Sequence, residues 1–216
     1  MNSWNRGEGF QCDCVRCATC RQHPEIGQLE ADIQAAYVSA CARHVPGSPG
    51  LKEAVDAALP RAARRRARAS FDALPLACQV PLCALLELEG AVLMAERKTA
   101  EGLAAFQRLE AIRAAANGGG SCGVSYTRLR EKLRVVGAAL MAGRADVATA
   151  EMRCVVTEAC FGPYALLTIG HVRQFALNFA ASVQAPPQVM AAVEELVPSV
   201  LRELLAKEQA RQRGAV

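Results

Sequence analysis

The sequence is poor in aromatic residues and in histidine, and it has no long uncharged apolar run. Aromatic residues make up 5% of the 216 residues, and only three histidines are present. Few histidines leave few side chains that titrate near neutral pH, and no glycine-rich phosphate loop follows a predicted strand. The most apolar stretch, residues 74–95, contains two prolines and two glutamates, which are costly inside a bilayer. These absences predict a protein that is not an enzyme, has no catalytic residues and does not span a membrane.

Runs of β-branched residues are scarce as well, which disfavours a sheet. Alanine, leucine, glutamate and arginine, all strong helix formers, are abundant instead. Apolar residues recur at helical spacing along most of the chain. The sequence therefore predicts an all-α fold, either a multi-helix bundle or a helical-hairpin array. The side chains expected in its core include Leu85, Leu93, Leu133, Val136, Leu140, Phe175, Phe179 and Leu196.

Cysteine and glycine divide the chain into regions. Residues 1–23 are rich in cysteine, and residues 24–116 form a predicted helical region that contains an arginine-rich helix. The glycine run at 117–123 is the clearest linker, and residues 124–216 form a second helical region. We expect residues 41–44 to complete a metal-binding segment together with residues 1–23.

One internal repeat is visible. The eight residues 90–97 and the eight residues 137–144 are identical at six positions and lie 47 residues apart. Each copy ends a predicted helix and precedes another, which predicts two helical hairpins of similar build, with Gly90 and Gly137 at matching positions. Such hairpins resemble the helical-repeat scaffolds of the tetratricopeptide and HEAT types. The offset exceeds the tetratricopeptide period of about 34 residues and lies at the upper edge of the HEAT range.

The ten cysteines bear on the cellular compartment. The first nine residues are polar and do not resemble a secretory signal peptide, and secreted disulfide scaffolds are shorter and less helical. We therefore expect a reducing, intracellular location, either cytoplasmic or, in a eukaryote or virus, nuclear. In that setting most cysteines outside the N-terminal run are expected to behave as small buried hydrophobic residues.

The N-terminal run places four cysteines within residues 12–20. Structural zinc sites use four thiolate or imidazole ligands, commonly as two closely spaced pairs joined by a loop. Cys17 and Cys20 form one such pair, and a second, C-x2-H, pair lies on a predicted helix. We therefore predict one zinc ion, with Cys14 able to replace one thiolate. The candidate ligands are Cys14, Cys17, Cys20, Cys41 and His44.

Two alternatives to zinc stay open. The spacing Cys14-x2-Cys17-x2-Cys20 is typical of an iron–sulfur loop, although the residue before Pro24 is His23 rather than cysteine. A thiol cluster without a native metal is the other alternative. A redox role for the Cys17 and Cys20 dithiol is disfavoured because such motifs usually open a helix in an α/β fold.

A basic cluster lies between residues 61 and 68. Guanidinium groups at spacings of three and four residues share one helix face, and their planar forks suit phosphates or carboxylates. The net charge of +4 is too small to imply nucleic acid by itself, and no aromatic residues interleave for base stacking. The candidate partner-binding residues are Arg61, Arg64, Arg65, Arg66 and Arg68.

These observations favour a non-enzymatic adaptor or regulatory protein that binds a protein partner through an all-α body with a zinc-stabilised N-terminus. A nucleic-acid-associated zinc protein that uses the helix at 61–68 is an alternative. An iron–sulfur or thiol redox protein is a second one.

Overall fold

The computed structural model describes residues 15–44, 50–116, 126–160 and 169–214 of the chain. Within these ranges every regular element is a helix and no strand occurs, so the predicted all-α class is confirmed. The metal-binding N-terminal segment is not confirmed, because residues 1–14 lie outside the described ranges. The predicted linker at 117–123 lies outside them as well.

The helices follow one another with short connections. Pro24 occupies the first turn of α2, where its missing N–H group costs nothing. Pro60 directly precedes α4, and Pro198 is accommodated inside α10. The elements are α1 (Val15–Gln22), α2 (Pro24–Arg43), α3 (Leu51–Ala58), α4 (Arg61–Asp72), the 3-10 turn η2 (Leu76–Cys78), α5 (Leu82–Ala95), α6 (Thr99–Ala116), α7 (Tyr126–Met141), α8 (Ala145–Cys160), α9 (Ile169–Ser182) and α10 (Pro187–Gly214).

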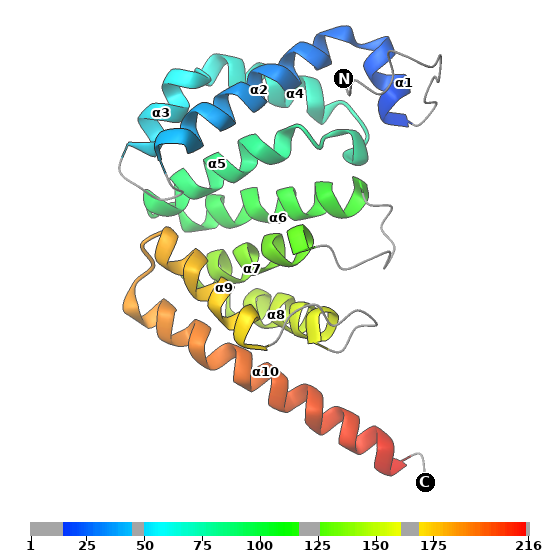
Figure 1. The fold of residues 1–216 in the computed structure, drawn as a ribbon, viewed down its shortest axis with the longest axis vertical. Helices are drawn as coiled ribbons and strands as arrows, with labels where there is room; N and C mark the ends of the chain where they lie inside the picture. Colours follow the sequence, from blue (N-terminus) through cyan, green and yellow to red (C-terminus); the bar gives the residue numbers. More distant parts are fainter. Residues whose placement is uncertain (1–14, 45–49, 117–125, 161–168, 215–216) are drawn as a thin grey trace.

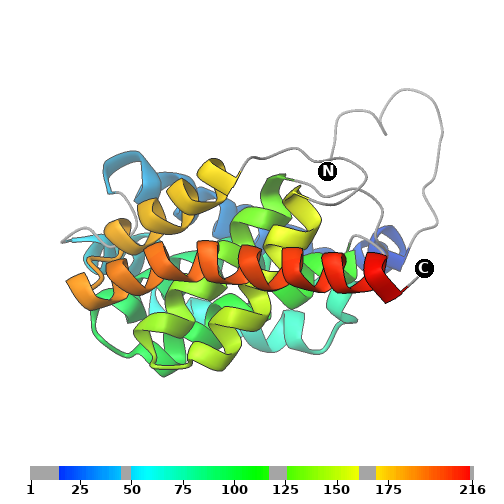
Figure 2. The ribbon, with the colours of Figure 1, turned by 90° about the horizontal axis from the view of Figure 1, so that it is seen from below.

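The helices form a stack that follows the order of the chain (Figure 1). Helices α2, α3 and α4 pack on α5, α5 packs on α6, and α6 packs on α7. Helices α8 and α9 cover α7, and α10 packs on α8 and α9. Seen from below, α10 crosses in front of the other helices, at the C-terminal end of the stack (Figure 2). The arrangement is that of a helical-hairpin array, in which each helix pair packs on its neighbours in sequence.

One turn type closes three of these hairpins. At the end of α5 the Lys98 N–H group donates to the Leu93 carbonyl over 2.9 Å, and at the end of α7 Arg144 donates to Ala139 over 2.8 Å. This 6→1 bond is the signature of the Schellman motif, which needs a residue in the left-handed conformation. The end of α9 repeats the bond. The left-handed residues are Arg97 (φ 63°), Gly143 (φ 71°) and Gln184 (φ 53°).

The two copies of the internal repeat are therefore not aligned as the sequence predicts. Arg97 and Gly143, which hold the same place in the turn, lie 46 residues apart, one fewer than the offset between Gly90 and Gly137. One residue on a helix is a rotation of about 100°, so the two glycines face different neighbours. A Cβ atom on Gly90 would lie 2.8 Å from the ring of Phe106 on α6, whereas one on Gly137 would lie 2.5 Å from a ring on α9.

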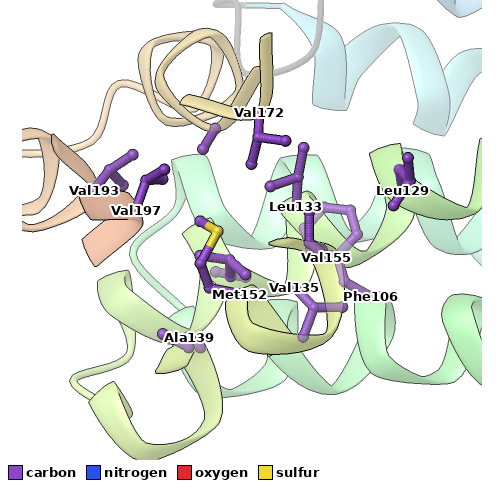
Figure 3. Packing of buried hydrophobic residues seen from close by; sticks show 14 of the residues in the cluster. Phe106, Leu129, Leu133, Val135, Ala139, Met152, Val155, Val172, Val193 and Val197 are labelled. Carbon is purple, nitrogen blue, oxygen red and sulfur yellow. The ribbon is translucent and has the colours of Figure 1, made fainter. Parts of the chain in front are cut away.

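The largest hydrophobic cluster joins the two predicted helical regions. Met94, Leu103 and Phe106 from α5 and α6 lie in one cluster with residues of α7, α8, α9 and α10. Figure 3 shows Phe106 close to Leu133 and Val155. The helices on either side of residues 117–125 thus share a core. Of the predicted core residues, Leu85, Leu133 and Val136 are fully buried, and Leu93, Leu140, Phe175, Phe179 and Leu196 are partly buried.

Among the described helices, none has both the length and the apolar character needed to cross a membrane.

Candidate functional site

The structure separates the ligands predicted for a single zinc ion. Cys17 and Cys20 lie on α1, which contacts the start of α2 and η2, whereas Cys41 lies in the last turn of α2. Between them α2 runs for 20 residues, which corresponds to a length of about 30 Å. Figure 1 shows α1 at one end of α2 and α3 at the other. The helical segment with Cys17 and Cys20 and the segment with Cys41 and His44 therefore lie at opposite ends of α2.

Cys41 and His44 have other contacts. The Cys41 thiol is in hydrogen-bond contact with the Tyr37 hydroxyl, and burial raises the pKa of Cys41, which disfavours the thiolate that a metal needs. The His44 backbone N–H group donates to the Ala40 carbonyl at the end of α2, and its ring packs near Gly50. Over the described ranges, no group of three or more His, Cys, Asp and Glu side chains is arranged to hold a metal ion.

The N-terminal cysteine run by itself stays the predicted metal site. Cys14 lies outside the described residues, and Cys17 and Cys20 are placed only as members of α1. Zinc and an iron–sulfur cluster both stay predictions for this run.

A buried ionic cluster ties α2, α5 and α7 together. Arg134 on α7 donates to Glu87 on α5 over 2.5 Å and to Glu131 over 3.0 Å. The Tyr37 hydroxyl donates to the same Glu87 carboxylate over 3.1 Å, and burial and this carboxylate raise the pKa of Tyr37. The Glu131 side chain is only 1% exposed. Because these groups are enclosed and paired with one another, their arrangement suits structural linkage of the two helical regions rather than contact with a ligand.

A cleft of about 680 Å³ opens between α3, α4, α5 and α6. This volume lies within the range of about 300–1,000 Å³ that is usual for ligand sites. Helix α5, which lies between α4 and α6 in the stack (Figure 1), contributes the apolar residues Leu86, Val92 and Leu93. The basic lining residues come from α3, α4, α6 and the turn before α6, and they are Lys52, Arg61, Arg64, Arg65, Arg68, Lys98 and Arg108.

The arginines of α4 fall into two groups. Arg64 is largely enclosed, with 12% of its side chain exposed, and lies 2.5 Å from Asp56 and 3.6 Å from Glu89. Arg68 pairs with the same Glu89 carboxylate. Internal carboxylates thus already neutralise these two guanidinium groups, so Arg64 and Arg68 are less available to a partner than the sequence predicts.

The second group is exposed. Arg61 and Arg65 line the cleft, are exposed to solvent and have no ion-pair partner among the described residues. Arg66 is also exposed but does not line the cleft. The structure therefore brings four of the five predicted basic residues, Arg61, Arg64, Arg65 and Arg68, to one concave surface.

The two ends of the cleft are held by further ion pairs. Glu96 lies 2.5 Å from the Lys52 ammonium group and 2.9 Å from that of Lys98, and hydrogen bonds from these two lysines lower the pKa of Glu96 to about 2. At the other end Arg108 pairs with Asp72. Together the lining holds seven basic and four acidic residues, so its electrostatic potential favours anions.

Sequence reasoning found the arginine helix but missed the opposite wall. Lys52 and Arg108 are isolated basic residues in the sequence and Lys98 belongs to a pair with Arg97, and only the packing of α3 and α6 around α5 brings the three lining residues to α4. No protein family, curated protein or solved structure matches this chain. The proposal for its function rests on the cleft.

Proposed function

We propose that this protein is a non-enzymatic adaptor that binds an acidic segment of a protein partner in the cleft between α3, α4, α5 and α6. One observation carries the proposal. Arg61 and Arg65 line a concave surface with their charges unmatched by any described residue. A guanidinium group is more weakly hydrated than an ammonium group, so it loses less hydration when a carboxylate binds beside it, and each can form a bidentate pair.

The apolar part of the lining indicates the shape of the segment. Val92 and Leu93 are partly exposed on α5, between the basic walls. An amphipathic helix or turn could place apolar side chains on these residues and carboxylates on the arginines, which is a common mode of peptide recognition by helical proteins. The apolar contact would supply affinity and the charges would select the partner.

The charged groups of the cleft suit binding better than proton transfer. Guanidinium groups stay protonated at all ordinary pH values, so Arg61 and Arg65 cannot act as general acids or bases. The carboxylates Glu89 and Glu96 are engaged by basic neighbours. These features support an adaptor over an enzyme.

Nucleic acid is the less favoured ligand. Among the described residues, the lining includes no aromatic side chain on which an unpaired base could stack. Its carboxylates Asp56, Glu89 and Glu101 would also repel a continuous phosphodiester backbone.

A peptide library tests the proposal. Degenerate 12-residue peptides with leucine at helical spacing and glutamate on one edge are passed over the immobilised protein, alongside peptides with glutamine in place of glutamate. We expect the acidic library to be retained, the double variant Arg61→Ala/Arg65→Ala to lose most of it, and Arg66→Ala to keep it. Equal loss in Arg66→Ala, or retention of both libraries alike, would count against the cleft as the binding site.

The same variants test the nucleic-acid alternative. If the ligand is nucleic acid, the logarithm of the binding constant for DNA or RNA should fall linearly with the logarithm of salt concentration. The slope should then be flatter for Arg61→Ala/Arg65→Ala than for Arg66→Ala.

A further inference from the structure

The exposed arginines of the cleft are a matched pair. Arg61 and Arg65 lie four residues apart on α4, so their side chains leave the same helix face with about 5–6 Å between the Cβ atoms. Both line the cleft and both lack an ion-pair partner among the described residues. A single anion between them could therefore accept hydrogen bonds from two guanidinium groups.

The excess of basic over acidic residues in the cleft indicates how much negative charge a matching anion should carry. Arg64 and Arg68 share Glu89, and Arg64 also pairs with Asp56. Arg108 is paired with Asp72, which lies outside the lining. When Asp72 is included with the four acidic lining residues, the seven basic ones exceed the acidic ones by two. A carboxylate would neutralise one of these charges, whereas a phosphate monoester carries a charge of about −1.5 to −2 at neutral pH.

We propose that the partner segment is phosphorylated, and that Arg61 and Arg65 hold its phosphate group jointly. The inference rests on the proposed function and specifies its ligand. A phosphate has three terminal oxygens that accept hydrogen bonds, so it can pair with both planar forks at once. A carboxylate has two oxygens and a single charge, so it balances only one of the two guanidinium charges even where both forks reach it. The neighbouring Glu89 blocks Arg64 and Arg68, which confines the phosphate to the Arg61 and Arg65 end of the cleft.

Three degenerate peptide libraries test this. All are fluorescein-labelled and identical except at a fixed central position, which is serine, glutamate or phosphoserine. We expect the phosphoserine library to bind at least tenfold more tightly than the glutamate library. The double variant Arg61→Ala/Arg65→Ala should abolish that difference.

Two further variants separate the effect of net charge from that of the planar guanidinium forks. Arg66→Ala/Arg202→Ala removes the same amount of charge from exposed positions outside the cleft, so it should keep the preference for phosphoserine. Arg61→Lys/Arg65→Lys keeps the charge but not the planar forks, and we expect it to lose most of the preference. Circular dichroism of each variant checks that the helices are retained.

The outcomes separate this inference from the proposed function. Equal binding of the phosphoserine and glutamate libraries would overturn the phosphate inference and leave the acidic-segment proposal standing. Binding of none of the libraries would overturn both. Inorganic phosphate that competes as well as the phosphoserine library does would identify a free phosphate site and overturn the peptide ligand.

Discussion

Phe106 on α6 and Phe179 on α9 meet edge to face, with their ring centroids 5.5 Å apart and their planes at 86°. Each ring also lies over a glycine, Phe106 over Gly90 and Phe179 over Gly137. The missing side chains of the two glycines make the room in which the two rings meet. This contact joins helices from both sides of residues 117–125, so it links the two helical regions at the centre of the largest core cluster.

Replacing either glycine by alanine should destabilise the fold. The new Cβ atom would lie 2.8 Å from the Phe106 ring in Gly90→Ala and 2.5 Å from the Phe179 ring in Gly137→Ala, so a ring must move. Overpacking of this kind costs about 1–3 kcal/mol, against a gain of about 1 kcal/mol in helix propensity. Gly27 on α2 has no atom within 4 Å of its Cβ position. Gly27→Ala should therefore be stabilising in the same urea-unfolding measurement.

The two substitutions should also be coupled, because the rings that they displace touch each other. In a double-mutant cycle of Gly90→Ala and Gly137→Ala we expect an interaction energy of at least about 0.5 kcal/mol. Additive effects would show that the two rings relax independently.

The buried ionic cluster should be sensitive to loss of its arginine. Arg134→Met removes the cation that faces both Glu87 and Glu131 and leaves two enclosed carboxylates without it. Breaking a buried pair in this way costs about 3–5 kcal/mol. The exposed pair of Arg144 and Asp146 is the control, and Arg144→Met should change the unfolding free energy far less. Similar losses in both variants would argue against a structural role for the cluster.

Stability should fall as the pH rises above about 9. Burial raises the pKa of the Cys83 thiol from 9.0 to about 11. The folded state therefore keeps the proton that the unfolded state releases, so this contribution is complete below pH 9 and is lost between pH 9 and 11. The slope for one such group is about 1.4 kcal/mol per pH unit. Urea unfolding at pH 8 to 10.5 checks this, and Cys83→Ala should flatten the slope. A variant whose slope is unchanged would contradict the assignment.

Metal content should not depend on the far end of α2. Because that helix separates α1 from Cys41 and His44, the variant Cys41→Ser/His44→Ala should bind as much metal as the unaltered protein after anaerobic purification. Cys17→Ser/Cys20→Ser should lose any metal that is bound. Elemental analysis gives the amounts, and absorbance in the visible range distinguishes iron–sulfur clusters from colourless zinc. Loss of metal on changing Cys41 and His44 would contradict the separation described here.

The helices could be predicted from the sequence because the spacing of apolar residues is a local signal. The zinc ligand set was predicted from the spacing of cysteine and histidine in the sequence, without regard to the length of the helix that lies between the two pairs. A helix that begins at Pro24 and continues to Cys41 carries its two ends about 25 Å apart, whatever the spacing of cysteines suggests. The shared helix face of the α4 arginines could likewise be predicted, because it follows from their spacing in the sequence. Its division into neutralised and exposed arginines depends on Glu89, which lies 21 residues beyond Arg68 in the sequence.

The internal repeat does mark two similar hairpins, but the residues that match in sequence are not the ones that match in structure. Gly90 and Gly137 are both required to be small, but each makes room for a ring on a different helix. The structural equivalence lies in the turns, at Arg97 and Gly143, where glycine and arginine occupy the same left-handed conformation. Identical residues therefore marked packing against two different rings, while the shared turn geometry was carried by different residues.

The left-handed conformation of Gln184 between α9 and α10 offers a practical use. A side chain in this conformation costs roughly 1–2 kcal/mol that glycine does not incur. Gln184 contributes its carbonyl oxygen to Arg97, and a glycine would keep that atom. The variant Gln184→Gly would therefore measure, as a change in the free energy of unfolding, the balance between relief of this conformation and loss of what the glutamine side chain contributes.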